Sequence, residues 1–123
     1  MKFDQLFAAD RRREDGAWID CPDLPGLRVK VRGVGSSAQE KAAAEFWKNA
    51  TDEHKKLPDI KELAQAYVIR EAILLDWNFE DRSFDVDAVK EALTIKLFRD
   101  AVLAAAAEVT SRGEAEKAAT EGN

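Results

Sequence analysis

The chain is poor in the residues from which most active sites and metal centres are built. Its 123 residues include one cysteine, Cys21, and one histidine, His54. A zinc site normally takes three or four Cys, His or carboxylate ligands at short spacings, and no such spacing surrounds either residue. Phosphate-binding glycine loops, GxGxxG turns and GxSxG nucleophile motifs are absent as well. The sequence therefore predicts a protein that is not an enzyme and that holds no cofactor or metal ion.

Other absences bear on the compartment. A single cysteine cannot form an internal disulfide, which is typical of a protein in a reducing environment. No apolar run approaches the roughly 20 residues that cross a bilayer. The N-terminal segment MKFDQLFAADRRRED lacks the apolar stretch of a signal peptide. We therefore expect a cytoplasmic protein that does not associate with a membrane.

Positive charge is also in deficit. Acidic residues number 24 against 19 basic ones, for a net charge of -5. Nucleic-acid binding needs a basic face that contacts phosphates, so this balance predicts no nucleic-acid partner. The cluster at 11–13, Arg-Arg-Arg, has no interleaved aromatic residue and is interpreted as a solvated helix end. With 46% apolar and 35% charged residues, the composition indicates one folded domain with a modest core.

The first regular element that the pattern predicts with a clear periodicity is a β-hairpin over about 16–33. Apolar and basic residues alternate along 27–32, which gives a strand one buried and one solvent-facing side. In the preceding run, Trp18 alternates with charged Asp20. The Pro-Gly pair at 25–26 suits the turn, because proline fixes φ and glycine adopts the positive φ of a type II turn.

Two helices are predicted after the hairpin. Ser36 or Ser37 is a good N-cap for a helix over about 38–56, which ends before a Leu-Pro pair. A second helix, over 59–77, is apolar around so much of its circumference that we expect it at the centre of the core.

A last helix is predicted from about 85 to 111, where Gly113 stops it. A kink or break near Thr94 is an alternative to one continuous helix. Residues 113–123 offer nothing larger than alanine to bury and are predicted to form a flexible tail. The expected fold is therefore α+β but mainly α: a single domain over 1–112, with an N-terminal hairpin followed by three to four packed helices.

Trp77 stands where the most apolar segment ends, directly after Asp76 and before a charged loop that leads to Phe84. A tryptophan at such a corner can cover the core while its indole N–H faces the loop. Phe84 can cover the core from the other side of that loop. We interpret these positions as structural rather than as a binding site.

The order of these segments resembles the tail assembly chaperones of long, non-contractile-tailed bacteriophages and related prophages. The resemblance rests on the stretches AILLDWNFED, RSFDVDAVKEAL and FRDAVLAAAAEV, within roughly 16–112. Many such chains carry a proline between the last two helical pieces, and EALTIKLFRD has none. The positions that match are Asp76 and Trp77, Phe84 with Asp85 and Asp87, and Arg99 with Asp100.

The resemblance implies a chaperone in the host bacterial cytoplasm. It would bind the tape measure protein, shield apolar helical segments of that protein and bring tail tube subunits to it. Such a protein needs an apolar groove or helix face for a partner helix. Packing inside the domain, or self-association into a homo-oligomer, are alternatives for the same surface. The candidate surface is a heptad seam on the last helix: Ile95, Phe98, Val102, Leu103 and Ala105.

Two other hypotheses are kept. A structural virion component, such as a head–tail connector or tail terminator subunit, is the first, although such ring-forming subunits generally use more β-structure than this pattern indicates. A small cytoplasmic regulator is the second. The acidity and the lack of a basic recognition helix speak against a DNA-binding regulator.

Overall fold

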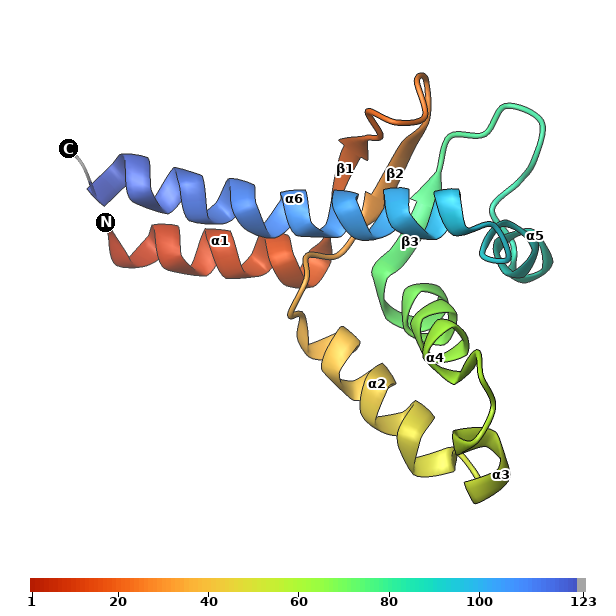
Figure 1. Cartoon of the computed structure of the whole chain (residues 1–123). Coiled ribbons are helices and arrows are strands. Elements are labelled where there is room, and N and C mark those ends of the chain that lie inside the picture. The colour runs from red at the N-terminus through yellow and green to blue at the C-terminus, as the bar shows by residue number, and fades with distance from the viewer. Residues whose placement is uncertain (122–123) are drawn as a thin grey trace.

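Three short strands form one antiparallel sheet, and the longest helix crosses one face of it (Figure 1). The structure, a computed structural model, describes the backbone of residues 1–121 and the side chains of residues 1–111. The strands, in sheet order, are β1 (Ala17–Asp20), β2 (Arg28–Val31) and β3 (Leu74–Trp77). The helices are α1 (Phe3–Asp15), α2 (Ser37–Asn49), α3 (Asp52–Lys55), α4 (Ile60–Val68), the π-helical η1 (Ile69–Ile73), α5 (Val86–Ala92) and α6 (Lys96–Glu121).

This architecture confirms an α+β fold that is mainly helical, with a hairpin near the N-terminus. The helices are shorter and more numerous than predicted: residues 1–121 contain six α-helices instead of three to four. One cause is a break inside the helix predicted over 38–56. Ala50 leaves the helical region with φ -70° and ψ 128°, and the Thr51 hydroxyl then caps α3 by accepting the His54 N–H at 3.1 Å.

The hairpin has the predicted turn. The Leu27 N–H donates to the Leu24 carbonyl at 3.0 Å, and Gly26 between them has φ +90°, as a type II turn requires. The alternation along β2 is confirmed, because Val29 and Val31 are fully buried. In β1 the inward residue is Ile19, while Trp18 lies on the open side with Asp20.

The largest departure from the sequence-based expectation lies in the segment predicted as a core helix over 59–77. The α-helix ends at Val68, η1 follows, and the chain then extends at Leu74 (φ -80°, ψ 120°) into β3. β3 pairs antiparallel with β2, with Trp77 opposite Val29. The free edge of the hairpin supplies hydrogen-bond partners that no helix end offers, so this apolar run becomes a buried strand.

The core lies between the sheet, η1 and the inner face of α6. The central position predicted for the segment around 69–77 is correct, although its strand conformation was not. The most completely buried apolar side chains in the described part of the chain are Ile19, Val29, Val31, Ile69, Ile73, Val102 and Val109.

The break near Thr94 is present. The Thr94 hydroxyl donates to the Glu91 carbonyl at 2.7 Å, and the Arg99 guanidinium donates to the Leu93 carbonyl at 2.7 Å. These bonds satisfy carbonyls at the end of α5 and let α6 start in a new direction. The predicted stop at Gly113 is wrong, because α6 continues to Glu121. A single glycine among alanine, glutamate and lysine costs only about 1 kcal/mol in a helix.

The flexible tail predicted over 113–123 cannot be assessed in the same way. Side chains from residue 112 onward, and residues 122–123 altogether, lie outside the described part of the structure.

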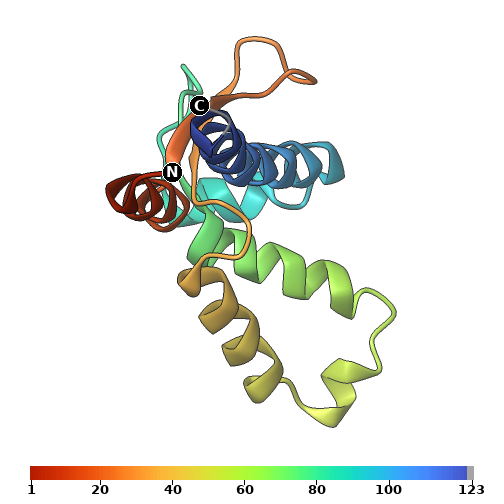
Figure 2. The same cartoon turned by 90° about the vertical axis from the view of Figure 1, so that its left-hand side faces the viewer.

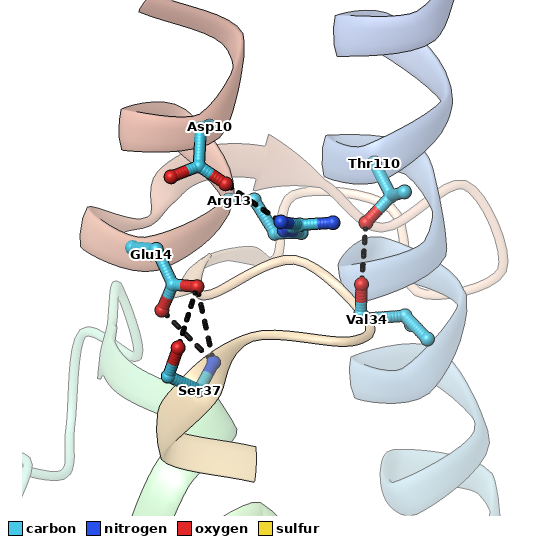
Figure 3. Close-up of polar contacts among 6 residues, drawn as sticks. All are labelled: Asp10, Arg13, Glu14, Val34, Ser37 and Thr110. Carbon is cyan, nitrogen blue, oxygen red and sulfur yellow. Dashed lines mark hydrogen bonds and ion pairs between the residues drawn. The ribbon is translucent and has the colours of Figure 1, made fainter. Parts of the chain in front are cut away.

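One junction holds α1, the loop after β2 and α6 together (Figure 3). The Gly33 N–H donates to the Arg13 carbonyl at 2.9 Å, and the Thr110 hydroxyl donates to the Val34 carbonyl at 3.0 Å. The Glu14 carboxylate accepts the Ser37 N–H at 3.0 Å and the Ser37 hydroxyl at 3.1 Å. The N-terminal helix is therefore fixed beside the C-terminal half of α6.

The start of α2 resolves the choice between two serines. Ser36 is the N-cap: its buried hydroxyl accepts the Gln39 N–H at 3.1 Å, while Ser37 is bound by Glu14. From this start α2, α3 and α4 form an arm that extends away from the sheet and from the α1–α6 pair (Figure 2). Phe46 of α2 contacts Tyr67 of α4 with ring centroids 5.5 Å apart.

Candidate partner-binding groove

Trp77 organises the corner of the domain where the predicted motif lies. Its ring is buried at the end of β3, not at a helix exit as the sequence predicted. It makes edge contacts with Phe79 and Phe84, both at 5.1 Å, and with Phe98 of α6 at 6.0 Å. The contact with Phe84 across the loop was expected, whereas the contact with Phe98 was not.

The neighbouring Asp76 has a local role. Its carboxylate accepts the Trp77 N–H at 2.8 Å, and the residue lies opposite Lys30 of β2. Both motif residues therefore hold the end of β3 and the loop that follows it, which is the structural role expected for them.

The predicted seam on α6 is mostly part of the core. Phe98, Val102 and Ala105 are buried, and Leu103 is half-buried against the same cluster. In this fold a partner helix cannot lie along the whole seam, because those side chains already contact the sheet and η1. Ile95 is the exception, since 55% of its surface is exposed.

An open apolar groove of about 890 Å³ lies beside Ile95. We call it the α6 groove. Three segments that are distant in the sequence line it: the turn between β1 and β2, the loop after β3, and the start of α6. Its apolar residues include Leu24, Leu27 and Phe98, which are half-buried or buried, and the exposed Phe79, Ile95 and Leu97.

The charge of the α6 groove is of one sign. Glu80 and Asp81 are the charged residues among those that line it, and no described basic side chain joins them. Each has its carboxylate on an exposed loop. A ligand that fills the groove would therefore contact an apolar surface with an acidic edge.

Sequence reasoning missed most of this groove. Leu97 lies off the heptad seam, and Phe79 was an aromatic residue in a charged loop with no assigned neighbour. The turn residue Leu24 was read only for its conformation. The available signal was the coincidence of a break near Thr94 with the apolar pair Ile95 and Leu97, because a helix start carries its side chains into the space that the break opens.

A second pocket, of about 440 Å³, lies on the arm. It is lined by Phe46 and Tyr67 and by the exposed Leu57 and Leu63. The Arg70 guanidinium at its edge already lies 5.4 Å from the Tyr67 ring centroid and is paired with the adjacent glutamate. This pocket is therefore smaller than the α6 groove, and its charged group is already engaged.

The chemistry of the remaining candidates is limited. Cys21 is buried, and its burial, together with the charges of Asp20 and Glu108, raises the pKa of the thiol above its ordinary value. Such a thiol is a poor nucleophile at neutral pH. Among the described side chains, no three Cys, His, Asp or Glu residues gather closely enough to hold a metal ion. No helix within residues 1–121 combines the length and apolar character of a bilayer-crossing segment.

Comparison with known proteins adds no relative to this picture. No family model matches the chain, and neither a curated protein nor a solved structure is similar enough to count as a match.

Proposed function

We propose that this protein is a non-catalytic binding protein that shields an apolar helix of a partner, and that it acts as a phage tail assembly chaperone. The observation that carries the first part is the α6 groove, where Phe79, Ile95 and Leu97 are exposed around a buried apolar floor. Grooves of this kind receive one face of an amphipathic helix through anchors three and four residues apart.

The resemblance to tail assembly chaperones supports the second part. The Asp-Trp motif at 76–77 and the aromatic residue Phe84 lie directly behind the groove, because Trp77 contacts both Phe84 and the groove residue Phe79. The residues that carry the resemblance thus shape the candidate binding surface. The proposed partners are the tape measure protein, whose long apolar helices need cover before assembly, and the tail tube protein.

Co-expression with the tape measure protein encoded in the same phage or prophage tests this proposal. We expect a soluble complex with wild-type protein and little soluble tape measure protein without it. Leu97→Asp and Ile95→Asp place a carboxylate in the groove and should abolish the complex, while circular dichroism and melting stay near wild type because both side chains are exposed.

The matched control is Trp47→Asp, which places the same charge on an exposed apolar residue of the arm. This variant should retain the complex. Failure of the wild-type protein to co-purify, together with a stoichiometric band of it in purified virions, would refute the chaperone function and favour a connector or tail terminator subunit.

A further inference from the structure

We infer that the α6 groove also receives α1 of a second copy of this chain, so that free copies associate head to tail. The inference rests on the groove of the proposed function but not on the identity of the partner. A partner helix and α1 of another copy would then compete for one surface, and the free protein would keep its apolar groove covered.

The apolar face of α1 has no partner within the chain. Phe3 and Phe7 form an edge-to-face pair with ring centroids 5.1 Å apart, yet 73% and 56% of their surfaces are exposed. Leu6 beside them is exposed too, and no residue of α1 is buried. Contact with the domain falls on another face of the helix, which carries the half-buried Arg12 and Arg13. Three exposed apolar side chains at spacings of three and four are the anchors that a helix-binding groove takes.

Charge favours this occupant. Lys2 lies next to Phe3, and Arg11 lies one turn beyond Phe7, so both bases border the apolar stripe. Of the two acids in the region, Asp10 is paired with Arg13 at 2.6 Å, and Asp4 opposes the two bases. The stripe therefore carries a basic border, which is complementary to the acidic edge formed by Glu80 and Asp81.

The contact must form between copies. The bond from Gly33 to the Arg13 carbonyl holds α1 beside the C-terminal half of α6, whereas the groove lies at the start of α6. These sites are at opposite ends of the long helix in both views (Figures 1 and 2). A surface that binds a different surface of the next copy gives a head-to-tail association, which either closes into a ring or continues as a chain.

Sedimentation analysis of two complementary variants tests the inference. Wild-type protein should show association that increases with concentration. Phe7→Glu removes the helix anchor and Leu97→Glu blocks the groove, and each should weaken self-association by about 30-fold or more, the size expected for an interface hot spot. Mixed in equal amounts, the two variants should form a heterodimer, because each retains the half that the other lacks.

Trp47→Glu, on the arm, is the control and should associate like wild type. The inference is overturned if the wild-type protein stays monomeric at all concentrations, or if the two variants are folded but do not pair when mixed. It is also overturned if either variant alone associates like wild type. Co-purification of Phe7→Glu with the tape measure protein is a separate readout: its retention supports the proposed function, and its loss counts against that function without deciding self-association.

Discussion

The indole Nε1 of Trp77 donates a 2.9 Å hydrogen bond to the carbonyl oxygen of Arg82, five residues further along the chain. This bond closes the loop after β3 around the tryptophan ring, so that one side chain both fills the core and satisfies a loop carbonyl. Arg82 in turn pairs through its guanidinium with Glu91 of α5 at 3.0 Å. The loop that borders the α6 groove is therefore fixed at both ends.

Trp77→Ala should lower the free energy of unfolding by about 3–5 kcal/mol, the range for truncation of a buried large aromatic side chain. Trp77→Phe keeps a ring but loses the bond to Arg82, and its cost should be smaller, with about 1 kcal/mol of it from the hydrogen bond. Denaturant midpoints measure both. The exposed Trp47→Ala serves as control, and an effect of Trp77→Ala no larger than that of the control would contradict the buried position.

Gly33→Ala should destabilise the junction of α1, the loop and α6. A Cβ added at Gly33 would lie 2.7 Å from the Thr110 hydroxyl oxygen and 2.9 Å from the Arg13 Cγ. We expect a loss of about 1–3 kcal/mol, as for other overpacked sites. Thermal unfolding of Gly33→Ala, Thr110→Ala and the double variant measures the coupling between the two sites.

The double variant should be more stable than the sum of the two single effects predicts, since Thr110→Ala removes one of the clashing atoms. Gly35→Ala is the matched control: its Cβ would meet no atom within 4 Å, and its cost comes only from φ +86°. Strict additivity at Gly33 and Thr110 would show that the clash is relieved in another way.

Cys21 should make stability depend on pH in the alkaline range. Burial raises the pKa of its thiol above the ordinary value of 9.0, so the unfolded chain loses this proton at lower pH than the folded one does. The contribution of Cys21 to stability is therefore complete below about pH 9 and is lost progressively as the pH rises toward the raised pKa. The difference between wild type and Cys21→Ala, measured from pH 7 to 10.5, isolates this effect from other groups; a constant difference would contradict it.

Asp85→Ala should cost about 1 kcal/mol, because the Asp85 carboxylate caps α5 by accepting the Ala88 N–H at 2.8 Å. Asp87→Ala removes a carboxylate from the same first turn but leaves the cap, and should cost only a few tenths of a kcal/mol. Urea denaturation distinguishes the two. Equal effects would indicate that charge near the helix start matters more than the capping bond.

Elements set by local chemistry could be predicted from the sequence. The alternation along 27–32 and the Pro-Gly pair at 25–26 specify the hairpin with contacts only a few residues apart. The same holds for the cap at Asp85 and the break near Thr94. In each case the side chain that determines the structure bonds to, or restricts, its own neighbourhood.

The strand at 74–77 could not be predicted in that way. An apolar run such as Ile73-Leu74-Leu75 fits a buried helix and a buried strand equally well. The choice depends on the free edge of β2, which lies more than 40 residues earlier in the chain. The α6 groove has the same origin, since 24–27, 78–81 and 92–98 meet only in the folded domain.

The join between η1 and β3 has a mechanical consequence. Ile73 ends the π-helical turn and Leu74 begins the strand, with no residue between them to act as a hinge. Arg32 binds both carbonyls before the join, its N–H donating to Ile73 at 2.9 Å and its guanidinium to Ala72 at 2.9 Å. A force on the arm is therefore transmitted along a rigid segment to Trp77, and from its ring to Phe79 at the edge of the α6 groove. Whatever binds the arm pulls on the groove as well.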